Sequence, residues 1–158
     1  MGQDRQAHLD GIVTGCVAGL ATITPASGYV GPAGAIFIGA AAGALCFYAV
    51  LFVKQRLVID DSLDVFAVHG VGGILGSLLL SVFALSALGG AGLAEGMSAG
   101  KQFGVQLLAV AVTAVWSAAA TWIIVKALSA AVGLRAGQEA EYDGLDLSLH
   151  GERAYDYT

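Results

Sequence analysis

Long stretches without a single Asp, Glu, Lys or Arg constrain this sequence more than any other feature. They cover residues 11–53, 65–92 and 102–125. A helix needs roughly 20 apolar residues to cross a hydrocarbon core that is about 30 Å thick. Because backbone polar groups in lipid must be hydrogen-bonded within the protein, such stretches predict membrane-spanning helices rather than irregular chain.

The composition agrees with a chain whose solvent is largely lipid. Hydrophobic residues make up 57% of the 158 residues and charged residues only 12%, whereas a soluble domain has roughly 25% charged residues. The net charge of -5 argues against a nucleic-acid partner, since no basic surface is left to replace phosphate counterions. Cys16 and Cys46 both lie in apolar stretches, which favours small buried side chains over a disulfide or metal site.

The first stretch is too long for one helix, and it contains two prolines and several glycines between residues 25 and 34. Splitting it there predicts an all-α membrane protein with about four helices. We expect them near 10–27, 33–56, 64–86 and 102–132. The membrane region then covers residues 1–132, and the acidic, polar residues 133–158 form a tail.

Basic residues set the expected orientation. With four spans, the N-terminus, the loop after Val53 and the tail share one side of the membrane, which holds six of the seven Lys and Arg residues. The other side holds only Lys101. Because cytoplasmic loops are enriched in Lys and Arg, both termini are predicted to be cytoplasmic, in a multi-pass protein of the plasma membrane.

Spacing adds two expectations about packing. Glycines recur every four residues at 11, 15 and 19, at 39 and 43, and at 72 and 76. Such small-residue faces let helices approach closely, so we expect a tight bundle. In the tail, Leu145, Leu147 and Leu149 are two residues apart, which favours an extended segment that docks on a partner surface.

His69 is the titratable residue that lies well inside a predicted span. A polar group at that depth is costly in lipid and normally faces a cavity or a partner. Imidazole titrates near neutral pH and both donates and accepts hydrogen bonds. Two interpretations stay open: His69 contacts a small polar substrate or relays a proton, or it hydrogen-bonds a neighbouring helix and only holds the bundle together.

The residues before His69 also have two interpretations. Asp64 can cap the third helix, which we favour, or attract cations, whereas Asp60 and Asp61 are expected to be solvated. Val65 and Gly73 share the face of His69, which suits a small neutral molecule. The sequence contains no nucleophile, metal cluster or second carboxylate beside His69, so we expect neither an enzyme nor a cofactor.

Three motifs resemble one known family. The run "IDDSLDVFAVHGVGGILGSLL" closely resembles a late-helix signature of the ammonium transporter family (Amt/Mep/Rh). "GCVAGLATITPASGYVGPAGAIFIGAAAGALCFYAV" resembles the two preceding helices, and "EYDGLDLSLHGERAY" resembles the cytoplasmic tail. The resemblance covers residues 11–157. It implies the last four helices of an eleven-helix fold that assembles as a homotrimer with one pore per subunit.

The resemblance also implies roles for individual residues. Ammonium or ammonia would be the substrate, His69 one of two pore histidines, Asp64 a structural or recruiting carboxylate, and Val65 a pore-lining residue. Residues near 141–157 would pack under the bundle and couple to gating, and a trimeric PII signalling protein is a possible partner. The tail positions that match are Tyr142, Asp143, Gly144, Leu145, Asp146, His150, Gly151 and Glu152.

The family's first seven helices have no counterpart in this sequence. The second pore histidine and the aromatic gate are therefore expected on a companion segment, without which we expect the chain not to conduct. A split product, a truncated gene and a fragment all fit this pattern. The alternative function is a non-conducting remnant or a membrane anchor whose tail binds a PII-type regulator.

Overall fold

A computed structural model of the chain describes residues 3–132 and 134–152, with side chains described from residue 11 onward. These residues form helices and contain no strand, which confirms the predicted all-α class. The chain falls into two compact units that divide between Thr113 and Ala114, and each unit is described by itself.

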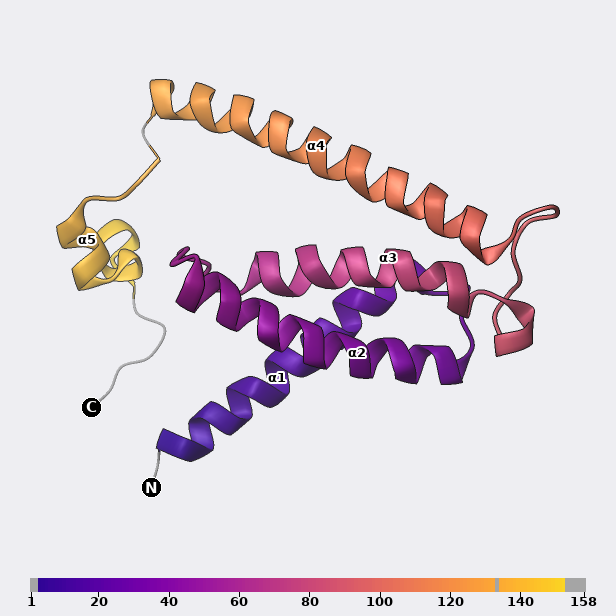
Figure 1. The fold of residues 1–158 in the computed structure, drawn as a ribbon. Coiled ribbons are helices and arrows are strands. Elements are labelled where there is room, and N and C mark those ends of the chain that lie inside the picture. Colours follow the sequence, from indigo (N-terminus) through magenta and orange to yellow (C-terminus); the bar gives the residue numbers. More distant parts are fainter. Residues whose placement is uncertain (1–2, 133, 153–158) are drawn as a thin grey trace. The chain divides into compact units, whose positions relative to one another are not determined.

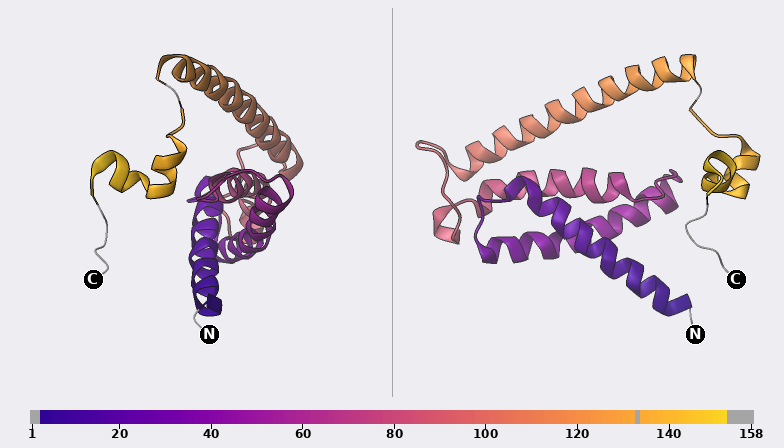
Figure 2. Two further views of the ribbon diagram at one scale, coloured as in Figure 1. Left: turned by 90° about the vertical axis from the view of Figure 1, so that its left-hand side faces the viewer. Right: turned by 180° about the vertical axis from the view of Figure 1, so that it is seen from behind.

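Three helices pack together in the first unit (Figures 1 and 2). They are α1 (Gln3–Ile23), α2 (Pro32–Leu51) and α3 (Gly72–Phe83). Short 3-10 and π-helical turns extend or precede them: η1 (Thr24–Ala26), η2 (Phe52–Arg56), η3 (Phe66–Val71) and η4 (Ser86–Leu88).

The predicted break after α1 has a local cause at each step. Pro25 lies in the 3-10 turn η1, and the chain then turns at Gly28, whose φ of +82° suits a residue without Cβ. Gly31 is the N-cap of α2, and Pro32 is its first residue. Proline suits that position because the first N–H groups of a helix have no helical partner in any case.

Small side chains fill the core where α1, α2 and η3 meet. Ala18, Cys46 and Val68 form one buried cluster. A Cβ on Gly76 would overlap the backbone carbonyl of Thr22, so α1 and α3 approach as closely as the glycine spacing predicts.

The other glycine faces are not used in this way. A Cβ would meet no atom within 4 Å at any glycine of the α1 set or the α2 pair. Among the described residues, these two faces therefore make no close crossing, whereas Gly76 on α3 does. Periodicity identifies a face of small residues, but the position of the neighbouring helix decides which face is packed.

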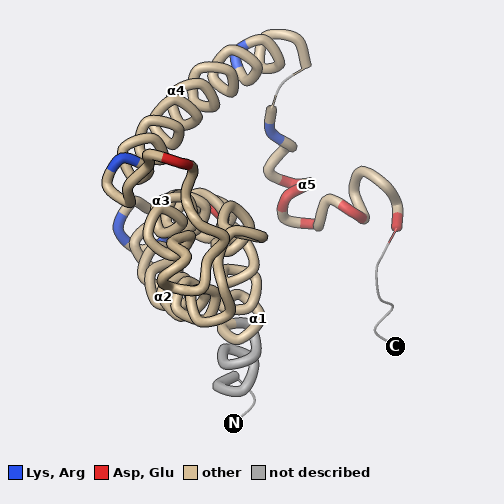
Figure 3. Tube along the Cα trace, turned by 90° about the vertical axis from the view of Figure 1, so that its right-hand side faces the viewer, with Lys and Arg blue, Asp and Glu red and all other residues tan. Residues whose placement is uncertain are grey.

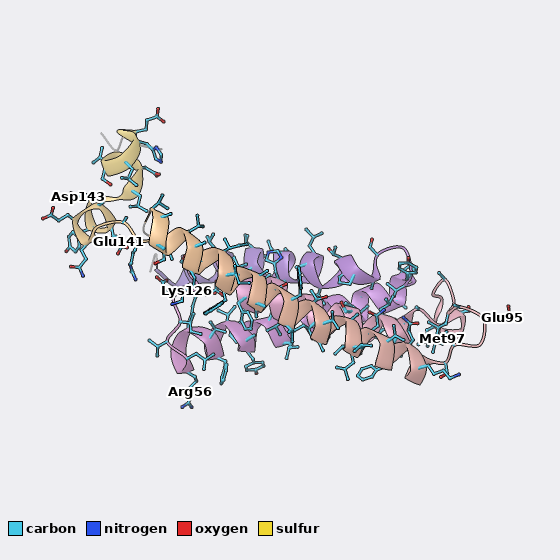
Figure 4. The ribbon with its side chains drawn as sticks, turned by 90° about the horizontal axis from the view of Figure 1, so that it is seen from above. Arg56, Glu95, Met97, Lys126, Glu141 and Asp143 are labelled. Atoms are coloured by element: carbon cyan, nitrogen blue, oxygen red, sulfur yellow. The ribbon has the colours of Figure 1, made fainter. Side chains whose placement is uncertain are left out.

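The helix α4 (Ala99–Ala131) follows a glycine-rich loop that carries Glu95 and Met97 (Figure 4). Within the first unit, this loop is bonded to the α1–α2 connection, because the N–H of Ala91 donates to the carbonyl of Tyr29 at 2.9 Å. No residue of α4 is buried.

Within the described ranges 3–132 and 134–152, three helical segments are long and apolar enough to cross a membrane: Pro32–Arg56, Phe66–Phe83 and Ala99–Ala131. Gly11–Ala26 is a shorter apolar helix, so the count of four spans stays a prediction. Figure 3 shows the bodies of α2 and α3 without Lys, Arg, Asp or Glu.

The tail in the second unit is helical, with α5 (Gln138–Asp143) followed by the π-helical turn η5 (Asp146–His150). The expectation of an extended segment at Leu145, Leu147 and Leu149 is therefore wrong. Ser148 supplies a physical reason, because its hydroxyl bonds the carbonyl of Gly144 at 2.9 Å and winds the chain back on itself. Residues 133 and 153–158 of the predicted tail lie outside the described residues.

Candidate functional site

His69 lies in η3, directly before α3, on an exposed side of the segment. Ala67 and Val68 are buried against α1 and α2, which fixes η3 in the three-helix unit. Within the part of the chain that the structure describes, the imidazole makes no hydrogen bond or ion pair. The described residues thus supply His69 with no bonding partner, and both interpretations of this residue stay predictions.

The surroundings of His69 are apolar. Val65, one turn earlier, is 51% exposed, and Phe66 is exposed as well. η3 is π-helical, a geometry that is rare and frequently found at functional sites. The segment thus presents one imidazole on an otherwise apolar, uncovered surface.

Asp64 does not make the predicted helix cap. Its carboxylate Oδ1 lies 2.8 Å from Nζ of Lys54. The cap is made by Asp61, whose two carboxylate oxygens accept the N–H groups of Val65 at 2.9 Å and Phe66 at 3.0 Å. The expectation of a capping Asp64 is therefore wrong, and Asp61 makes the cap in its place.

The backbone conformation explains why Asp61, and not Asp64, caps the helix. Asp64 has a φ of +55°, a left-handed conformation that Asp tolerates better than most residues, and it follows a tight turn closed by the bond from its own N–H to the Asp61 carbonyl. This turn places the Asp61 side chain over the first free N–H groups of the helix. The carboxylate of Asp64 is left to pair with Lys54.

A groove of about 290 Å³ lies between α1 and α2, and Asp64 is one of its lining residues. Its lining is mostly small or apolar and includes neither Val65 nor His69. The lining residues are Gly11, Thr14, Gly15, Ala18, Gly43, Cys46, Phe47, Val50 and Asp64. The structure thus separates the Asp64 carboxylate from the exposed surface of Val65 and His69.

The matched tail positions lie in or beside α5 and η5. Arg135 holds this segment through two bonds to Glu141, Nε to Oε1 at 2.8 Å and Nη2 to Oε2 at 3.3 Å. The hydrogen bond from the guanidinium holds the pKa of the Glu141 carboxyl below its ordinary value. Figure 4 labels Glu141 and Asp143 on α5.

The tail side chains are free to meet another surface. Tyr142 is 95% exposed and Leu149 is exposed too. Gly144 and Gly151 end α5 and η5 with positive φ. Asp146 begins η5, His150 ends it, and Glu152 follows Gly151.

Among the residues whose side chains are described, no group of three His, Cys, Asp or Glu could hold a metal ion. Sequence reasoning missed Lys54 as a site residue and Asp61 as the helix cap. A signal for Lys54 was present, because it is the first charge after the apolar stretch 11–53 and Asp64 is the last before the next stretch. Two opposite charges at the two ends of one connection are candidates for a pair.

A sequence profile described as the Ammonium Transporter Family matches residues 2–155. An ammonium transporter of Bacillus subtilis is 42% identical over 154 residues, which cover 96% of this chain and 38% of that protein. Ammonium transporter Amt1 of Archaeoglobus fulgidus is 49% identical, over 92% of this chain and 37% of that protein.

A solved structure is similar to this chain as well. A structure named Sensor Amt Protein aligns with a TM-score of 0.78 and 36% identity, over 88% of this chain and 34% of that one. This chain thus spans about a third of the length of the relatives that it matches.

Proposed function

Because this chain belongs to the ammonium transporter family, we propose that it forms the C-terminal third of an ammonium transporter and supplies one side of its pore. A companion segment, on the same or another polypeptide, carries the remaining helices. Membership of this family makes the chain a membrane protein of a transport family rather than an enzyme.

The observation that carries the proposal is the uncovered imidazole of His69. A histidine on an apolar membrane segment needs a polar partner, because an unpaired polar group in hydrocarbon is costly. This chain provides none among its described residues. The partner on the proposed transporter is the substrate, together with a second histidine on the companion segment.

The chemistry follows from the difference between NH₄⁺ and NH₃. An apolar pore cannot hydrate an ion, and a bare charge in hydrocarbon costs several kcal/mol or more. NH₄⁺ therefore loses a proton before or during passage. His69 offers neutral NH₃ a hydrogen-bond partner and can carry the proton, while Val65 forms apolar wall beside it. K⁺ has no proton to lose, so it is excluded.

The proposed assembly is a homotrimer in the plasma membrane, with the tail on the cytoplasmic side. The excess of Lys and Arg on the side of both termini supports this orientation. In this arrangement the residues of α5 and η5 contact the cytoplasmic face of the bundle and influence gating. A PII-type protein that plugs the pore exit is the proposed regulator.

A second candidate function is a membrane anchor whose tail recruits such a regulator without transport. The compact second unit favours it, because α5 and η5 are held by their own bonds through Arg135 and Ser148. Such a tail presents the same surface whether or not a pore is present.

Ammonium uptake in cells that lack their own transporters tests the proposal. This chain is expressed alone, with the companion helices, and with those helices and His69→Ala. Val82→Ala is the matched control, because Val82 is an exposed apolar residue at the other end of the same helical segment. We expect uptake only with the companion helices, lost in His69→Ala and kept in Val82→Ala.

Other outcomes contradict the proposal in defined ways. Conduction by the purified chain alone in liposomes would refute the need for a companion segment. Correct insertion of both parts without uptake would support the anchor or an inactive remnant. Unchanged uptake and ion selectivity in His69→Ala would remove His69 from the pore.

A further inference from the structure

The ion pair between Lys54 and Asp64 joins the two ends of the connection between α2 and η3. Nζ and Oδ1 are 2.8 Å apart, and the side chain of Asp64 is only 19% exposed, against 41% for Lys54. An exposed ion pair contributes little, but breaking a mostly buried one is costly because it leaves an uncompensated charge. Only Asp64 is mostly buried, so removal of Lys54 would leave a mostly buried carboxylate without its counter-charge.

The connection between the two residues is not fixed by its own backbone preferences. Val58 has a φ of +52°, which is unfavourable for a β-branched residue, and Asp64 has a φ of +55°. Such conformations persist where the surrounding structure determines them. Lys54 supplies that constraint at one end, and the Asp61 carboxylate, bonded to Val65 and Phe66, supplies it at the other.

The environment of the Asp64 carboxylate argues against a role in recruiting cations. It lines the groove between α1 and α2, and Ala18, Cys46 and Phe47 line the same groove. A free cation that approached Asp64 would have to displace an ammonium group that is already 2.8 Å away. Lys54 thus offsets the charge with which Asp64 could attract NH₄⁺.

We propose that Lys54 is a positioning residue for His69, and that Asp64 serves as its structural counter-ion rather than as a cation-recruiting carboxylate. Lys54 holds Asp64, Asp64 directly precedes the segment Val65–Val71, and the placement of that segment sets the position of the imidazole. This inference rests on the proposed function and decides between the two roles that the sequence left open for Asp64.

A direct readout is the imidazole of His69 in the full chain, reconstituted in lipid nanodiscs with ¹⁵N-labelled histidine. The sequence has three histidines, and the signal that disappears in His69→Ala is that of His69. We expect Lys54→Gln to move the His69 resonances and Arg56→Gln to leave them in place. Arg56 is the matched control, because it belongs to the same turn η2 and carries the same charge, but its side chain points away from the helices (Figure 4).

Transport kinetics separate positioning from recruitment, since the two roles predict opposite results. If Asp64 recruits cations, Lys54→Gln uncovers its charge and lowers the KM for ammonium. If Lys54 positions His69, Lys54→Gln lowers the maximal rate by about tenfold or more, with KM little changed. The assay uses this chain with its companion helices, and Arg56→Gln again serves as the control.

A second variant and a second readout cover the cases in which the first experiment fails. Where Lys54→Gln fails to insert, the double variant Lys54→Gln/Asp64→Asn leaves no unpaired charge in the groove, and we expect the same shift of the His69 resonances. Where the wild-type pair of segments shows no uptake, the proposed function fails, but the resonances still test the positioning role. Unmoved resonances in these variants, or a lowered KM, would overturn the inference.

Discussion

The thiol of Cys46 on α2 donates a hydrogen bond to the backbone carbonyl of Val68, the residue directly before His69, with Sγ and O 3.9 Å apart. Cys46 is 1% exposed and Val68 is buried beside it. The hydroxyl of Thr22 on α1 lies in the same place, within 2.5 Å of where a Cβ on Gly72 would sit. Side chains from two helices thus meet the backbone on both sides of His69.

Replacing Cys46 tests this contact. Cys46→Ala removes a buried side-chain atom and a donor, so we expect a loss of about 1 kcal/mol in the free energy of unfolding. Cys46→Ser keeps a donor and should lose less. Cys16→Ala is the control, since Cys16 is the exposed cysteine of α1. Thermal unfolding in detergent measures all three, and equal losses for Cys16→Ala and Cys46→Ala would contradict the prediction.

The approach of α3 to α1 predicts a large effect at a single glycine. A Cβ in Gly76→Ala would overlap the Thr22 carbonyl, so the helices must move apart, at a cost of about 1–3 kcal/mol. Gly73→Ala on the same helix meets no atom within 4 Å and should be neutral or slightly stabilising. Denaturation with sodium dodecyl sulfate compares the pair. Equal stability of the two variants would show that the helices do not pack this closely.

The cap made by Asp61 predicts local fraying in front of His69. Asp61→Ala removes both acceptors for the N–H groups of Val65 and Phe66 and should cost about 0.5–2 kcal/mol. Hydrogen exchange of those two amides should become faster. Asp60→Ala changes the neighbouring, exposed carboxylate and should leave the exchange as it is. A response to Asp60→Ala as large as that to Asp61→Ala would refute the assignment of the cap.

The pair of Arg135 and Glu141 predicts a pH dependence in the tail. Because the bond from Arg135 lowers the pKa of the Glu141 carboxyl in the folded chain, it stabilises the tail fully above the ordinary Glu pKa. That contribution is lost as the pH falls through the lowered pKa. Carboxyl ¹³C titration of the full chain should show the lowered pKa, and Arg135→Ala should return it to its ordinary value. A Glu141 pKa that is the same with and without Arg135 would contradict the pairing.

The sequence was sufficient for features that depend on local chemistry. Uncharged stretches located the apolar helices, and Pro25, Gly28 and Pro32 located the break between α1 and α2. It was insufficient where two nearby residues compete for one role. Asp61 and Asp64 both precede the same helix, and only the left-handed backbone at Asp64 decides which of them caps it.

The tail is a second place where the sequence pattern did not predict the local structure. Alternating leucines predict an extended segment only if no nearby side chain bonds the backbone. Ser148 does so, through Gly144, and the segment becomes η5. The proposed pore role of His69 depends on residues outside this chain. Its imidazole has no bonding partner among the described residues of this chain, so neither the sequence nor the fold of this third can supply the other side of the pore.

The length of α4 has a consequence for the bilayer. Between Lys101 and Lys126 lie the uncharged residues 102–125, which at a rise of 1.5 Å per residue span about 36 Å. The hydrocarbon core is only about 30 Å thick. The helix must therefore tilt, thicken the surrounding lipid or place its excess against other protein, while the long side chains of the two lysines reach for the opposite headgroup layers. The tilt of this helix should therefore depend on the thickness of the membrane.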